Sequence, residues 1–146
     1  MFLFSLINFI LKIYIYIYAM NKWYETLNRA PWTPPNYVFG IVWSILYVLM
    51  FISFTLVFFN KKCKGVCEPI LFFLLQLVLN LSWTTVFFTY KQLVAGLILI
   101  FTIICLVAYT AYLFYSIDKT ASLLLIPYLL WLCVAFSLNA YIVMYN

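Results

Sequence analysis

The amino-acid sequence predicts an all-α membrane protein, a bundle of five transmembrane helices in one domain covering residues 1–146. Of its residues, 69% are hydrophobic and 8% are charged, whereas a soluble domain is about half apolar and about 25% charged. The charged side chains gather in short clusters between long apolar runs. These clusters divide the chain into five apolar segments, each with the roughly 20 residues that a helix needs to cross about 30 Å of hydrocarbon.

The expected helices cover residues 2–20, 36–59, 69–89, 92–116 and 120–144. A closed barrel would need strands of about 10 residues with alternating polarity, and only residues 13–18, IYIYIY, alternate in this way. They lie inside an apolar run of helical length. We therefore expect a multi-pass integral membrane protein with membrane lipid as a partner. Lysine and arginine are spread so evenly over the loops that they fix neither the orientation nor the host membrane.

The net charge of +5 does not indicate a nucleic-acid-binding protein, because the basic residues are scattered over short loops. We expect no nucleic acid as a partner. Cys63 and Cys67 stand close together after the second segment, but a metal site takes about four ligands and the chain has no histidine. We expect neither a metal site nor a redox pair there, and no cofactor elsewhere.

Residues 2–20 are interpreted as a retained span, because no basic region precedes them and no small-residue cleavage site follows. The next segment, residues 21–35, is rich in aromatic residues and proline. Its rings pack either in the lipid headgroup region or over the mouth of the bundle as a lid. The prolines stiffen the segment, which favours the lid.

Pro34 or Pro35 is expected at the first turn of the second helix, where the missing N–H of a proline costs nothing. Phe39, Trp43 and Tyr47 then recur every four residues, so they share one face of the helix. This row of rings is predicted to line one wall of a site.

The third helix carries Gln76, Asn80, Trp83 and Phe87 on one face. A carboxamide buried without a partner costs about 1–3 kcal/mol, so both amides must face protein or a bound molecule. They either join neighbouring helices or line a pocket. The indole on the same face favours the pocket.

The fourth helix is expected to be scaffold, and the fifth is expected to kink at Pro127, which lacks a backbone donor. Beyond the proline, Tyr128, Trp131 and Ala135 form a row along one face, with Asn139 one turn further on. The small Ala135 either permits close helix contact or leaves room for a ligand ring. The sequence does not distinguish the two.

The chain resembles the family of tryptophan-rich sensory (TspO) proteins and mitochondrial translocator proteins, also called peripheral-type benzodiazepine receptors. The matching blocks are WYETL at 23–27, WTPPNYVFG at 32–40, VWSILYVLM at 42–50, QLVLNLSW at 76–83 and PYLLW at 127–131. The resemblance implies a five-helix bundle, often a homodimer, that binds tetrapyrroles such as protoporphyrin IX and, in animal members, cholesterol. Its pocket lies under the first loop, and its lining positions fall on Trp43, Asn80, Trp83, Trp131 and Ala135, with Trp32 in the lid.

Some positions depart from the family pattern. The sterol-recognition pattern of animal members needs a basic residue soon after a tyrosine, and none follows Tyr141 or Tyr145. A tetrapyrrole is therefore a better expectation than a sterol. Residues 70–75, ILFFLL, lack the small side chains of a tight dimer interface, so a homodimer is a weaker expectation than the pocket.

The expected function is to bind, and to transport or sense, a flat apolar ligand between the second, third and fifth helices. An enzyme that degrades bound porphyrin by photo-oxidation is an alternative. However, the three acids lie outside the spans and histidine is absent, which leaves general acid–base catalysis almost without candidates. A third alternative is a subunit whose rings serve only packing. The expected ligand-binding residues are Trp32, Phe39, Trp43, Tyr47, Gln76, Asn80, Trp83, Phe87, Tyr128, Trp131 and Ala135.

Overall fold

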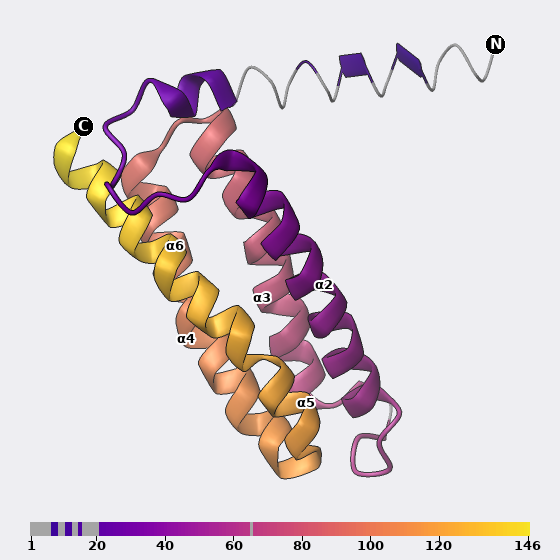
Figure 1. Ribbon diagram of the computed structural model, residues 1–146. Coiled ribbons are helices and arrows are strands. Elements are labelled where there is room, and N and C mark those ends of the chain that lie inside the picture. The colour runs from indigo at the N-terminus through magenta and orange to yellow at the C-terminus, as the bar shows by residue number, and fades with distance from the viewer. Residues whose placement is uncertain (1–6, 9–10, 13–14, 16–20, 65) are drawn as a thin grey trace.

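The computed structural model describes residues 7–8, 11–12, 15, 21–64 and 66–146. Its helices from residue 36 onward are α2 (Asn36–Phe58), α3 (Glu68–Thr84), the π-helix η1 (Thr85–Thr89), α4 (Leu93–Ile117), α5 (Lys119–Leu124) and α6 (Ile126–Tyr145). They lie side by side in an elongated bundle (Figure 1). The first predicted span, residues 2–20, falls largely outside the described residues, so the count of five spans stays a prediction.

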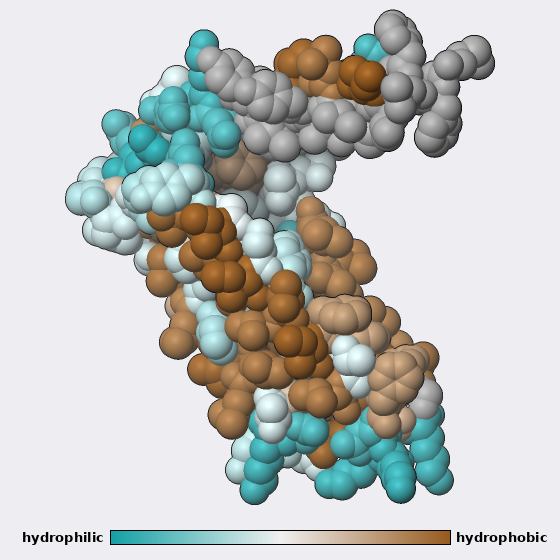
Figure 2. Space-filling model, turned by 45° about the vertical axis from the view of Figure 1, so that its right-hand side comes forward, coloured by the Kyte–Doolittle hydropathy of each residue, from teal (hydrophilic) through white to brown (hydrophobic). Residues whose placement is uncertain are grey.

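Four helical stretches in the described part of the chain are long and apolar enough to cross a membrane: Asn36–Phe58, Glu68–Thr89, Leu93–Ile117 and Lys119–Tyr145. Each end lies within one residue of the bound predicted from the apolar runs. Figure 2 shows apolar side chains along the length of the bundle and hydrophilic ones gathered at its two ends. This distribution is the one that a surrounding bilayer requires.

The last predicted helix is broken near its proline, as expected. The amide of Leu125 binds the carbonyl of Ser122 at 3.1 Å, and α6 begins at the next residue, with Pro127 in its first turn. Proline has no N–H to continue the α-helical ladder. The break separates the short α5 from α6 and lets α5 pack against α2, where Ser53 Oγ donates to the Ala121 carbonyl at 2.7 Å.

The third helix does not end as a regular α-helix, which the sequence had suggested. Its last turn widens into η1, in which the Tyr90 amide binds the Thr85 carbonyl, five residues back, at 3.1 Å. Lys91 then adopts φ 53°, in the left-handed region that non-glycine residues rarely occupy. A π-turn shifts the residues after it around the helix axis, and here it sets the positions of Phe87 and Phe88.

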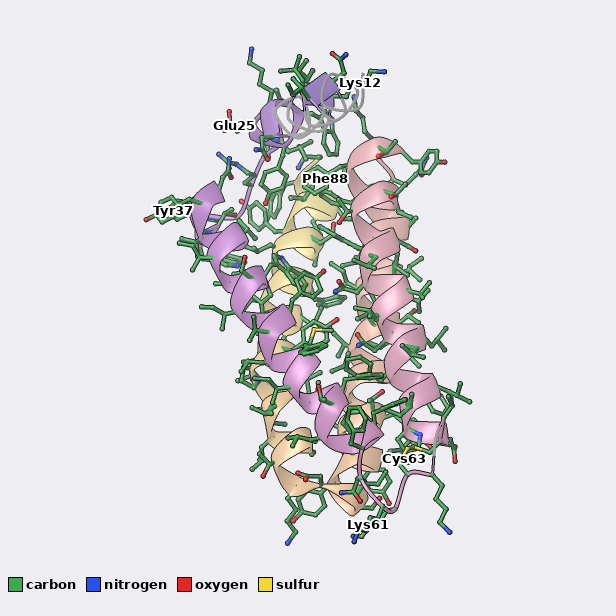
Figure 3. The ribbon with its side chains drawn as sticks, turned by 90° about the vertical axis from the view of Figure 1, so that its right-hand side faces the viewer. Lys12, Glu25, Tyr37, Lys61, Cys63 and Phe88 are labelled. Carbon is green, nitrogen blue, oxygen red and sulfur yellow. A yellow bond between two sulfur atoms is a disulfide. The ribbon has the colours of Figure 1, made fainter. Side chains whose placement is uncertain are left out.

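The loop between α2 and α3 corrects one prediction, because Cys63 and Cys67 form a disulfide. Residues after α2 do not continue its α-helix. The Asn60 amide binds the Val57 carbonyl and the Cys63 amide binds the Asn60 carbonyl. The α-carbons of the two cysteines are thereby 5.5 Å apart, within the range that a disulfide spans. Cys63 lies at the opposite end of the bundle from Glu25 and Phe88 (Figure 3).

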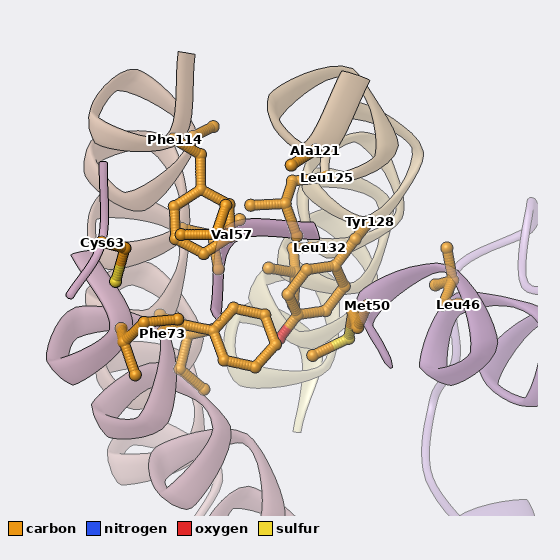
Figure 4. Packing of buried hydrophobic residues seen from close by; sticks show 14 residues of the cluster. Leu46, Met50, Val57, Cys63, Phe73, Phe114, Ala121, Leu125, Tyr128 and Leu132 are labelled. Atoms are coloured by element: carbon orange, nitrogen blue, oxygen red, sulfur yellow. The ribbon is translucent and has the colours of Figure 1, made fainter. Parts of the chain in front are cut away.

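A compact apolar core fills the half of the bundle next to α5. Phe73 of α3 stacks on Phe114 of α4 with ring centroids 5.9 Å apart, and Val57, Leu125 and Leu132 are buried with them. Figure 4 shows these side chains in contact. Since this half is filled, any sizeable internal space must lie in the half near residues 21–35.

Candidate functional site

A cavity of about 270 Å³ lies in that second half, between α2, α3, η1, α4 and α6, with part of residues 21–27 at its mouth. Most of its wall is aromatic or aliphatic. None of the described residues that line it is acidic or basic. A cavity of this kind favours an uncharged, largely apolar ligand.

The α2 wall of the cavity consists of the predicted row Phe39, Trp43 and Tyr47. The Phe39 ring meets the edge of Trp131 from α6 at 5.8 Å between centroids. Trp43 lies 5.7 Å from Tyr47 and 6.2 Å from Tyr128. The regular spacing of these rings along the sequence thus indicated their common face correctly.

The α3 wall consists of Asn80, Trp83 and, in the π-helix, Phe87. The Trp83 and Phe87 rings are stacked, with centroids 4.9 Å apart and planes 17° from parallel. From α6 come Trp131 and Ala135. The indoles of Trp43, Trp83 and Trp131 therefore face one space from three different helices.

A chain of hydrogen bonds forms the floor of the cavity. The Tyr47 hydroxyl donates to Asn80 Oδ1 at 2.8 Å, and Asn80 Nδ2 donates to the Tyr128 hydroxyl at 3.0 Å. The Tyr128 hydroxyl donates in turn to Gln76 Oε1 at 2.9 Å. These bonds join α2, α3 and α6, so both carboxamides face protein, as predicted. Gln76 and Tyr128 lie below the cavity and do not line it.

Trp32 is the third expected site residue that does not line the cavity. Its side chain is 56% exposed, its Nε1 donates to Ser137 Oγ at 3.3 Å, and its ring meets the edge of Tyr141 at 5.5 Å. It holds its loop against the outer side of α6. The expected residues that line the cavity are Phe39, Trp43, Tyr47, Asn80, Trp83, Phe87, Trp131 and Ala135. Their contact with a ligand stays a prediction.

Residues 21–27 pack over the mouth as the lid interpretation requires. The rings of Trp23 and Tyr24 meet the edge of Phe87 at 5.7 and 6.3 Å. The following loop is tied to the end of α6, where the Asn28 amide donates to Asn146 Oδ1 at 2.9 Å and Asn146 Nδ2 donates back to the Asn28 carbonyl at 3.1 Å. We refer to residues 21–35 as the lid.

Two basic side chains, one from the lid and one from the loop after η1, lie over aromatic rings of the lid. The Arg29 guanidinium lies 5.4 Å from the centre of the Tyr24 ring, and Lys91 Nζ lies 5.5 Å from that of Trp23. Burial raises the pKa of Tyr24, and the positive charge of Arg29 partly opposes this. The Tyr24 phenol is therefore neutral at physiological pH, which suits its place beside the Phe87 ring.

Comparison with known proteins identifies the family of this chain. The family model described as TspO/MBR family matches residues 2–145. The chain belongs to the TspO/MBR family. This confirms the resemblance seen in the sequence and, with the apolar helices, shows a multi-pass integral membrane protein.

Individual TspO/MBR relatives agree over most of the chain. The chain is 34% identical over 119 residues to the tryptophan-rich sensory protein of Cereibacter sphaeroides, and the match covers 82% of this chain and 73% of that protein. It is 33% identical over 130 residues to protein CrtK of Rhodobacter capsulatus, and this match covers 84% of the chain and 78% of CrtK. It is 34% identical over 122 residues to the human translocator protein, and this match covers 81% of the chain and 71% of the human protein.

The expected ligand-binding residues leave out several that line this TspO/MBR cavity, above all Asn139 of α6, which is 2% exposed. Asn21 and Tyr24 of the lid also line it. Asn139 lies one turn beyond Ala135 on the same helical face, and a lone carboxamide in an apolar span was a signal that could have identified it.

Proposed function

We propose that this TspO/MBR protein binds a flat apolar ligand in the cavity, and that the ligand is a tetrapyrrole. The observation that supports this is the convergence of Trp43, Trp83 and Trp131 on one uncharged space. Each ring stacked on a macrocycle contributes about 0.5–1.5 kcal/mol beyond the burial of its area. Extended aromatic walls of this kind favour the tetrapyrrole binding that the family resemblance implies.

The size of the cavity adds a requirement to the proposal. Its volume of about 270 Å³ lies just below the range of about 300–1,000 Å³ typical of small-molecule sites. A tetrapyrrole must therefore displace part of the lid or extend into the mouth. Arg29 and Lys91 stand beside the lid rings there, where they are suited to pair with the carboxylates of a porphyrin.

We also propose that the protein acts by binding rather than as an enzyme. General acid–base catalysis uses histidine, acids, lysine, tyrosine or cysteine, and the described lining residues offer only tyrosines from this set. Tyr47 is already engaged with Asn80. Binding is compatible with transport, in which the ligand would be released, and with sensing, in which it would be retained.

A homodimer is the other partner that the resemblance implies. Leu71, Leu74, Leu75, Val78 and Leu81 expose large apolar side chains along α3. This surface suits either a second copy or lipid, so dimerisation stays a prediction. Sedimentation of the protein in detergent of matched density tests it.

The test of ligand binding is a titration of the purified protein with protoporphyrin IX in nanodiscs, followed by tryptophan fluorescence. We expect saturable quenching at micromolar ligand. Trp83→Leu should weaken binding by about 2- to 10-fold, the loss of one stacking contact. Tyr112→Leu is the control, because it removes an exposed ring of α4 that does not line the cavity, and it should leave the affinity unchanged.

Two other results would replace the proposal. If no saturable quenching occurs at micromolar ligand, the rings serve packing alone. If the porphyrin absorbance bands disappear only in illuminated samples, and no longer do so in a Trp131→Phe variant, the protein is an enzyme that degrades its ligand.

A further inference from the structure

A second hollow lies where the lid meets the end of α6, and it is open to the surroundings. Its volume is about 710 Å³, within the range of about 300–1,000 Å³ typical of small-molecule sites. It is formed by residues of the lid between Glu25 and Pro35 and by Tyr141 and Tyr145 of α6. None of its described lining residues also lines the cavity. The hollow is therefore a separate place on the protein.

The two walls of the hollow are held together by the protein itself. Asn28 of the lid donates through Nδ2 to the Tyr145 carbonyl at 3.0 Å, and its backbone is bonded to the Asn146 side chain. On the α6 side, the rings of Tyr141 and Tyr145 are stacked with centroids 4.3 Å apart. A ligand therefore finds a site that is already formed, which lowers the ordering cost of binding.

An acid and a base line this hollow without pairing with each other. Glu25 Oε1 accepts from Asn36 Nδ2 at 3.2 Å, while its Oε2 has no partner in the described part of the chain. The Arg29 guanidinium lies over the Tyr24 ring and makes no hydrogen bond or ion pair with a described residue. The hollow thus offers one negative and one positive group, an arrangement that complements a zwitterion.

The hollow lies at the level where two spans leave the membrane. The first residue of α2 is Asn36 and the last of α6 is Tyr145, and Figure 1 shows the end of α6 beside the lid. Around it, Trp32, Tyr37 and Tyr145 are 56%, 70% and 57% exposed. Exposed tryptophan and tyrosine rings at the ends of spans are typical of the lipid headgroup region. The zwitterions that surround the protein at this level are phospholipid headgroups.

We propose that the hollow binds the headgroup of a phosphatidylethanolamine. The Arg29 guanidinium donates to the phosphate, whose oxygens match its planar fork of N–H groups. The primary ammonium donates to Glu25, while the acyl chains stay in the bilayer. A phosphatidylcholine carries no N–H on its ammonium. A phosphatidylglycerol carries no ammonium, and Glu25 repels its net negative charge.

The first test compares lipids on the wild-type protein. Ligand-free protein in detergent is titrated with phosphatidylethanolamine, phosphatidylcholine or phosphatidylglycerol of identical acyl chains, and bound lipid is counted by native mass spectrometry. Porphyrin is left out, because its carboxylates would compete for Arg29. We expect phosphatidylethanolamine to bind about tenfold more tightly than either of the others, the effect of one charge-assisted hydrogen bond.

Variants assign the two halves of the headgroup. Arg29→Gln should weaken phosphatidylethanolamine and phosphatidylglycerol alike, by about tenfold, whereas Arg29→Lys should restore most of the affinity because it keeps the charge. Glu25→Gln should remove the preference for phosphatidylethanolamine over phosphatidylglycerol. Lys119→Gln is the matched control, since Lys119 also lies over a tyrosine ring, that of Tyr115 at 5.5 Å, but does not line the hollow. It should leave all three affinities unchanged.

Three results would overturn the inference. The first is equal binding of the three lipids to the wild type, and the second is a preference that survives Glu25→Gln. The third is displacement of the lipid by equimolar glycerophosphoethanolamine, the same headgroup without acyl chains, which would show a site for a soluble phosphate ester. None of these results bears on the cavity, so the headgroup site and the proposed porphyrin binding stand or fall separately.

Discussion

The hydrogen bonds at the floor of the cavity can be tested by removing one hydroxyl. Tyr128→Phe keeps the buried ring but deletes the group that accepts from Asn80 and donates to Gln76. An interhelical hydrogen bond in a membrane protein contributes about 0.6 kcal/mol on average and up to about 1.7 kcal/mol. Two such bonds are lost, and a buried donor, Asn80 Nδ2, and a buried acceptor, Gln76 Oε1, are left unpaired. We expect the free energy of unfolding to fall by about 1–3 kcal/mol.

The measurement is equilibrium unfolding of the folded protein in bicelles, by helical circular dichroism. Tyr112→Phe is the control, because it removes a hydroxyl from a tyrosine that is 72% exposed, and it should change the stability by less than about 0.5 kcal/mol. Tyr47→Phe should have a smaller effect than Tyr128→Phe, since Tyr47 makes one bond of the chain. Equal stability of the Tyr128→Phe and Tyr112→Phe variants would refute the reasoning.

Three further predictions concern the lid and the distant loop. Asn146→Ala removes the two bonds that its side chain makes to the Asn28 backbone and should speed amide hydrogen exchange in residues 21–33 about tenfold. Unchanged exchange there would contradict the anchoring role. Replacing both Cys63 and Cys67 by serine opens a very short loop and should cost about 2 kcal/mol of stability by chain entropy, with porphyrin affinity unchanged because the cavity is at the other end. Burial raises the pKa of Tyr24 above its ordinary value of 10.0. The neutral phenol therefore stabilises the folded lid below pH 10, and this stabilisation is lost as pH rises through the raised pKa. Amide hydrogen exchange in the lid should accelerate in that pH range in the wild type, and less in Tyr24→Phe.

Much of the bundle follows from the sequence because membrane insertion imposes simple lengths. A run of apolar residues bounded by charges can only be a span, and the four described spans end within one residue of the expected positions. Pro127 breaks its helix for a covalent reason that needs no tertiary information. The rows of rings on α2 and α3 follow equally from the helical period.

The features that escaped prediction depend on which groups become neighbours. Asn80 and Asn139 are both carboxamides in apolar spans, yet only the first meets two hydroxyls. Trp32 faces Ser137 because of the path of the lid, which helical periodicity does not describe. The π-turn at Thr85–Thr89 and the turn that joins Cys63 to Cys67 are backbone choices made outside regular α-helix. The sequence pattern of a helix therefore predicts which side chains share a face, but it does not predict which side chains of other helices those residues contact.

The bonded chain from Tyr47 to Gln76 has a consequence for the design of synthetic ligands. Since it ties three helices together beneath the cavity, a compound has little freedom to push deeper. Substituents that lengthen a molecule should be accepted where they emerge beside Tyr24 and rejected where they press on Asn80. A chemist seeking potency would therefore extend scaffolds toward water and keep the inward edge short.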